Sequence, residues 1–196
     1  MSNPDRARLA GTACLAGGVL QLASIATGLG TRTPPAGLVI WGLAMVCLMG
    51  GPLGLLALRA AGGRRLGYFG AGLALLGQAT QVAGMVYIAV YPALEDEQLF
   101  TPLGAQAIWI GMLLLGVATV RAGALTGWRR LAPLAVPAYF VAQVVAIQIP
   151  FYFSKGLNPN YAVLGAWGLA WIVLGLAIRT TSSQRSAAGT PAATTS

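Results

Sequence analysis

The sequence predicts an all-α integral membrane protein, a bundle of six transmembrane helices. Of its 196 residues 57% are hydrophobic and only 8% are charged, whereas a soluble domain carries about 25% charged residues. The mean hydropathy is +0.73. All charged residues fall between or beyond six uncharged runs of 18 to 26 residues, and a bilayer core of about 30 Å takes roughly 20 helical residues to cross. The runs are 9–28, 37–58, 66–91, 103–120, 131–153 and 161–178.

The first run also resembles a secretory signal peptide, because it follows Arg6 and Arg8 and ends near a small-residue cleavage pattern at 24–26. Gly17, Gly18 and Gln21 make a poor signal-peptide core, so we interpret this run as a membrane helix. The six-helix domain then covers 1–179. The short connections between the runs leave no room for a soluble domain.

Prolines mark several of the later elements. Pro52 in the second run and Pro133 and Pro137 in the fifth predict kinks, since a mid-helix proline removes a backbone hydrogen bond. Thr101 and Pro102 are a good cap and first residue for the fourth helix. Residues 180–196 are rich in Thr, Ser and Ala without an apolar period, so we expect a disordered tail.

The basic residues sort to one side of the predicted bundle. Ten of the 12 precede odd helices or follow even ones, and only Arg32 and Lys155 lie on the other side. Because positive residues are retained in the cytoplasm, both termini should be cytoplasmic. Eleven arginines to one lysine, with abundant Ala and Gly, indicate a bacterial plasma membrane.

The net charge of +8 is therefore explained by topology. Nucleic-acid binding is not expected, since it needs basic residues interleaved with aromatics on an exposed face. The expected partners are the lipid bilayer and anionic lipid headgroups attracted to the cytoplasmic arginine rim. Cys14 and Cys47 lie at different depths of their helices, which argues against a disulfide.

The odd helices share a polar position. Gln21, Gln78 and Gln143 each follow an Arg–Leu helix opening, twelve residues after the leucine. This spacing suggests three tandem helical hairpins, near 9–65, 66–130 and 131–185, related by an axis along the membrane normal. Chance similarity in a sequence dominated by Gly, Ala and Leu is the alternative.

Five polar residues form the candidate site, and they should face the bundle interior because an unsatisfied polar group in hydrocarbon costs several kcal/mol. One interpretation is a neutral polar site near mid-membrane. The simpler one is interhelical hydrogen bonding, worth about 0.6–2 kcal/mol per contact, which needs no cavity. The five are Gln21, Ser24, Gln78, Gln81 and Gln143.

Small residues recur at steps of three and four along several helices and predict close packing seams. Aromatic residues gather near the predicted outer boundary, which is typical of an interfacial belt. Trp171 lies deeper and is expected in the core. The predicted belt comprises Trp41, Tyr87, Tyr91, Phe100, Trp109, Phe151, Tyr152, Phe153 and Tyr161.

The absences argue against most chemistry. There is no histidine, and the six runs contain no Asp, Glu or Lys, which excludes bis-His haem, a buried carboxylate proton relay and a retinal Schiff base. We expect no catalytic residue, no metal site and no cofactor. An enzyme using Glu95, Asp96 and Glu97 in an outer loop remains a weaker possibility.

Two functions follow as hypotheses. The first is binding or passage of a small neutral or amphipathic molecule through a glutamine-lined interior. The alternative is a structural or accessory subunit that docks another membrane protein, or a second copy, through small-residue seams. A hollow interior at the glutamines favours the first and a solid core favours the second.

Overall fold

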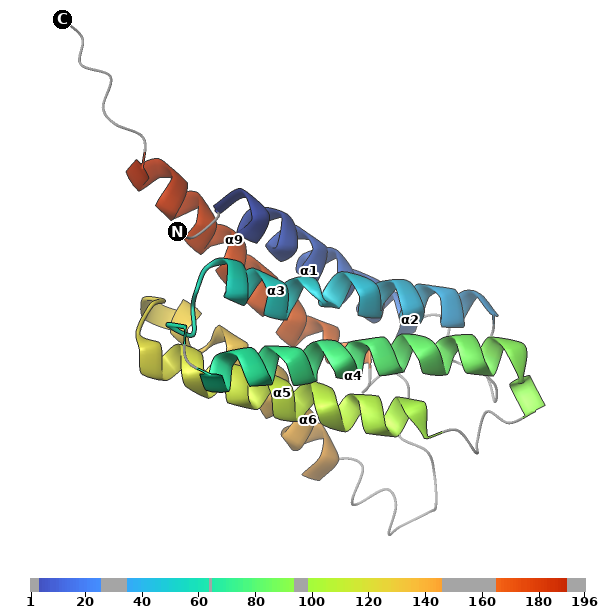
Figure 1. The fold of residues 1–196 in the computed structure, drawn as a ribbon. Coiled ribbons are helices and arrows are strands. Elements are labelled where there is room, and N and C mark those ends of the chain that lie inside the picture. Colours follow the sequence, from blue (N-terminus) through green and yellow to red (C-terminus); the bar gives the residue numbers. More distant parts are fainter. Residues whose placement is uncertain (1–3, 26–34, 64, 94–98, 146–164, 190–196) are drawn as a thin grey trace, which may run out of the picture.

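The computed structural model describes residues 4–25, 35–63, 65–93, 99–145 and 165–189, and these fold as helices and turns without a strand. Figure 1 shows the long helices lying side by side, roughly antiparallel. In chain order the elements are α1 (Pro4–Ser24), α2 (Pro35–Leu48), α3 (Gly50–Ala57), α4 (Arg65–Val90), α5 (Phe100–Ala122), the 3-10 turn η3 (Gly127–Arg130), α6 (Ala132–Gln143) and α9 (Gly168–Gly189).

The helices form a closed ring in chain order. Among the described helices, each packs against the next, from α1 through α2 and α3 to α4, α5, α6 and α9, and α9 then packs against α1. In the middle, α3 also touches α9. The interior is filled by large apolar side chains that are fully buried, among them Met45, Leu48, Ile108, Met112, Leu115, Trp171 and Leu174.

Two helix pairs pack more closely than the rest, α1 with α9 and α4 with α5. Glycines seven residues apart make this possible on all four helices. A Cβ placed on Gly18 would lie 2.7 Å from the Gly168 carbonyl oxygen, and one on Gly70 would lie 2.7 Å from the Gly111 carbonyl oxygen. Since no side chain fits there, backbone meets backbone. The predicted seams therefore close inside the chain.

Three segments are long and apolar enough to cross a membrane: Pro35–Ala57, Arg65–Val90 and Phe100–Ala122. The other helices fall short among the described residues for identifiable reasons. Polar residues and the charges at its start dilute α1, the described part of α6 has 12 residues, and α9 carries Arg179 and Arg185. Large apolar side chains also cover the outside of the bundle, for example Val39, Leu76, Leu103 and Leu169. The chain is thus suited to a membrane.

The helix boundaries differ from the predicted runs in several places. Helix α5 begins at Phe100, so Thr101 and Pro102 lie in its first turn and not at its cap. The second run is divided at Met49 into α2 and α3, since Pro52 has no N–H to donate to the Leu48 carbonyl. Pro137 lies inside α6 as predicted. The ends predicted for the first and fifth runs and the start of the sixth lie outside the described residues.

The expected disordered tail differs most from the structure, because α9 continues as a helix through Gly189. Thr180, Thr181 and Ser183 donate their hydroxyls to carbonyls four residues earlier in the same helix. Arg185 donates to the Leu58 carbonyl at 2.7 Å and to the Ala124 carbonyl at 3.2 Å. These contacts fix the extension of α9 against the end of α3 and the connection after α5.

Every arginine of the described residues lies at one end of the bundle. This arginine-rich end contains the start of α1, the α3–α4 turn, the end of α5 with η3, and the second half of α9, all at the left of Figure 1. The residues predicted for the other side, Arg32, Lys155 and the acidic trio, lie outside the described part of the chain.

Candidate functional site: buried glutamines

All five predicted site residues are buried. Gln21 and Gln78 have no exposed surface, and Gln81, Gln143 and Ser24 are at most 5% exposed. The five side chains come from α1, α4 and α6. Their orientation is the one expected of amides in a membrane bundle, where hydrocarbon offers no hydrogen-bond partner.

Gln21 is enclosed by the close approach of α1 to its neighbours. A Cβ on Gly18, one turn earlier, would meet the backbone of α9, and a Cβ on Gly17 would lie 2.9 Å from the Ala44 carbonyl oxygen of α2. The Gln21 side chain itself starts beside Gly168, whose Cβ position is 3.3 Å from the Gln21 Cβ. Glycines therefore let α1 lie close to α2 and α9 at the level of this amide.

Gln81 bridges two helices. Its Nε2 donates to the Thr101 carbonyl at 3.1 Å, which joins α4 to the first turn of α5. A Cβ on Gly104 would lie 2.9 Å from the Gln81 Cγ, so the glycine makes room for the bridge. Gln81 thus takes the role of interhelical hydrogen bonding that the sequence allowed as the simpler interpretation.

Ser24 is bonded within its own turn. Its hydroxyl donates to the Gln21 backbone carbonyl at 2.6 Å. This bond satisfies the hydroxyl locally and leaves the Gln21 amide group untouched. Ser24 thus bonds to the backbone of the last turn of α1.

The other glutamine amides have no partner in the described protein. Both side-chain polar atoms of Gln21, Gln78 and Gln143, and Oε1 of Gln81, are buried without a hydrogen bond. The indole Nε1 of Trp171 is also buried without a hydrogen bond. A buried polar group without a partner costs about 1–3 kcal/mol by mutational data. Within the described residues, these atoms are therefore left without a hydrogen-bond partner.

A row of aromatic rings crosses the bundle interior and was not predicted. Trp109 stacks on Phe140 at 5.8 Å between ring centroids, Phe140 contacts Trp167 at 5.6 Å, and Trp167 contacts Trp171 at 5.9 Å. The row joins α5, α6 and α9. Trp167 lies in the turn just before α9 and Trp171 lies in its first turn, and their four-residue spacing is the sequence signal for this contact. Trp171 is fully buried, as expected of a core tryptophan.

Trp109 was assigned to the interfacial belt, yet its ring stacks on Phe140 within this row. The Trp167 indole donates to the Val136 carbonyl at 3.0 Å, which ties the turn before α9 to α6. Tyr87, Tyr91 and Phe100 do cluster at the end opposite the arginines, with ring centroids 5.2 and 5.5 Å apart. The belt residues at 151–153 and 161 lie outside the described residues.

The chemistry available at the glutamines is neutral hydrogen bonding. An amide group offers two donors and one acceptor oxygen and does not titrate. Comparison with protein-family models, with curated proteins and with solved structures finds no match to this chain. A ligand that pairs with these buried, uncharged amides would itself be uncharged and carry polar atoms to exchange hydrogen bonds.

Proposed function

We propose that this chain is a six-helix protein of a bacterial plasma membrane that binds or passes a small neutral or amphipathic molecule through its glutamine-lined interior, without catalysis. One observation carries the proposal. Three glutamines from three different helices bury both polar atoms of their amides without a partner among the described residues. If these glutamines served only to join helices, their polar atoms would be paired, because such a contact stabilises the protein through its hydrogen bond.

Both termini are placed in the cytoplasm by this proposal. The grouping of the described arginines at one end of the bundle supports that orientation. The closed ring of described helices supports three tandem hairpins around one axis, although the two closest pairs, α4 with α5 and α1 with α9, are not equivalent in such a repeat. In that arrangement Gln21, Gln78 and Gln143 lie at one depth, within about 11 Å or two helical turns, and this remains a prediction.

The filled interior of the described bundle favours the alternative, docking of another membrane protein through small-residue seams, over a hollow binding site. The position of the seams argues against that alternative. The seams of α1, α4, α5 and α9 are in contact with one another inside the chain, where a single Cβ would meet backbone atoms. A docking partner would have to use the apolar outer surface, which lipid covers equally well.

The test is ligand binding by the full chain in lipid nanodiscs, read as the shift of the thermal unfolding midpoint. The probes are small neutral amides and diols and a neutral monoacylglycerol, each with a charged analogue of similar size. We expect a neutral probe to raise the midpoint, its charged analogue to have no effect, and Gln21→Met and Gln143→Met to weaken binding at least tenfold. Equal binding by both variants, equal shifts from charged analogues, or no shift from any neutral probe would overturn the proposal.

A further inference from the structure

Arg59 adopts a backbone conformation that arginine seldom takes. Helix α3 ends in a motif in which the Arg59 N–H donates to the Leu56 carbonyl and the Ala60 N–H to the Leu55 carbonyl, both at 2.9 Å. This termination needs a left-handed residue after the cap, usually glycine. Arg59 occupies that position with φ of 50°, and every other positive φ among the described residues belongs to a glycine. The fold alone gives no reason for an arginine there.

The Arg59 side chain is not needed to finish the helix. Arg185 already donates to the carbonyl of Leu58, the residue that caps α3. The Arg59 side chain is exposed and makes no hydrogen bond or ion pair with the part of the chain that the structure describes. Its guanidinium is therefore free for a group outside the protein.

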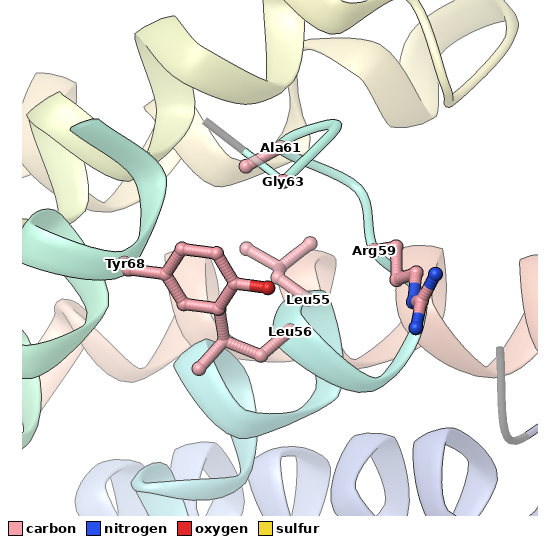
Figure 2. Close-up of a pocket in the computed structure, with 6 residues that line it drawn as sticks. All are labelled: Leu55, Leu56, Arg59, Ala61, Gly63 and Tyr68. Atoms are coloured by element: carbon pink, nitrogen blue, oxygen red, sulfur yellow. The ribbon is translucent and has the colours of Figure 1, made fainter. Parts of the chain in front are cut away.

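A small, shallow crevice lies beside Arg59, between the end of α3 and the start of α4. Figure 2 shows Tyr68 reaching from α4 towards Leu55 and Leu56, with Arg59 at the other edge and Ala61 and Gly63 on the turn above. The lining is apolar apart from the Tyr68 hydroxyl, backbone groups and Arg59, and it includes no acidic residue. Tyr68 is 57% exposed and Phe69 next to it 65% exposed, so the crevice opens beside an apolar outer face.

We propose that this crevice, the Arg59 crevice, binds one anionic phospholipid. Part of an acyl chain packs against Leu56 and the Tyr68 ring, and the headgroup phosphate accepts hydrogen bonds from the Arg59 guanidinium. Arginine suits a phosphate because its planar fork donates two parallel hydrogen bonds. The crevice lies at the arginine-rich end, which the positive-inside rule places on the cytoplasmic side. Anionic headgroups are concentrated in that leaflet. The proposal rests on membrane insertion and not on the glutamines.

The test uses the full chain in detergent, with retention of phosphatidylglycerol and phosphatidylcholine measured by native mass spectrometry. Arg59→Gly removes the guanidinium and suits the left-handed backbone, so it should fold at least as well as the natural chain. Arg65→Gln is the control, since it removes one exposed charge from the same turn outside the crevice lining. We expect Arg59→Gly to weaken phosphatidylglycerol binding about tenfold, the loss expected when a charge-assisted hydrogen bond to phosphate is removed, and Arg65→Gln to weaken it less than twofold.

Equal losses in the two variants would overturn the proposal in favour of a diffuse attraction to the arginine rim. Equal retention of phosphatidylcholine and phosphatidylglycerol by the natural chain would overturn it as well. Glycerol 3-phosphate, the soluble headgroup, is added as a competitor of phosphatidylglycerol. Displacement of the lipid at equal concentration would overturn the proposal, because it would indicate a phosphate site without lipid specificity. Arg59→Asn, which also tolerates the left-handed backbone, should repeat the loss seen with Arg59→Gly.

Discussion

At the scale of single residues, Gln78 and Gln81 stand three positions apart on α4 but differ in their bonding. Gln81 donates to the Thr101 carbonyl, whereas both polar atoms of the Gln78 amide are buried without a partner in the part of the chain that the structure describes. A side chain kept for stability should form hydrogen bonds. One kept for binding a ligand leaves them open at some cost in stability.

Methionine substitutions separate the two roles, since methionine keeps the length of glutamine and removes its polar atoms. Gln78→Met should raise the free energy of unfolding by about 1–2 kcal/mol, because it removes a buried group without a partner. Gln81→Met should lower it by about 0.6 kcal/mol or more through loss of the interhelical bond. Reversible unfolding in mixed micelles measures both. If both substitutions destabilise, Gln78 has a structural partner and the site hypothesis is wrong for it.

Burial of the glutamines could be predicted from the sequence, but their bonding could not. The cost of an amide in hydrocarbon requires an inward orientation whatever the fold. Which amides find partners depends on the backbone of another helix, and the Thr101 carbonyl is available to Gln81 only because Gly104 has no side chain to separate α4 from α5. Arg59 is similar: its left-handed backbone follows from the way α3 ends, and no sequence pattern marks it.

At the scale of the elements, the four helices with glycines seven residues apart (α1, α4, α5 and α9) form two close antiparallel pairs. On α4 the glycines are not equivalent. Gly70 and Gly77 face α5, where a Cβ would meet backbone atoms within 2.7 Å, but a Cβ on Gly72 would meet nothing within 4 Å. Glycine is therefore required for close packing on one face of α4, whereas on the other face a larger residue would fit.

Alanine substitutions test this difference. Gly77→Ala places a Cβ 2.6 Å from the Gly104 carbonyl oxygen and should destabilise the protein by about 1–3 kcal/mol, because the helices must separate. Gly72→Ala should stabilise it by up to about 1 kcal/mol through helix propensity. Thermal unfolding of the two variants in the same detergent gives the comparison. Equal effects of either sign would show that α4 and α5 do not pack through this seam.

Helix positions followed from the charge-free runs because length and hydropathy are local properties. The second, third and fourth runs match the structure within three residues at each end. The extension of α9 was missed because its Thr and Ser residues favour a tail by composition. What orders this segment is distant in the sequence, namely Arg185 on the Leu58 and Ala124 carbonyls and Arg129 on Gln184.

At the scale of the whole molecule, the account depends on insertion of the ring in a membrane with its arginine-rich end inside the cell. Three segments are apolar and long enough to span, and the outer surface carries large apolar side chains that water would not favour. Both the glutamine site and the Arg59 crevice depend on this environment. Hydrocarbon makes the unpartnered amides costly, and the cytoplasmic leaflet supplies the anionic headgroups.

Cysteine labelling in intact cells tests this placement most directly. In a background with Cys14 and Cys47 replaced by alanine, single cysteines are introduced as Glu97→Cys, Lys155→Cys and Arg65→Cys. A membrane-impermeant maleimide should label the cysteines at 97 and 155 from outside and reach the one at 65 only after the cells are permeabilised. Labelling of the cysteine at 65 in intact cells, with those at 97 and 155 protected, would contradict the orientation, and recovery of the chain in the soluble fraction would contradict the membrane protein itself.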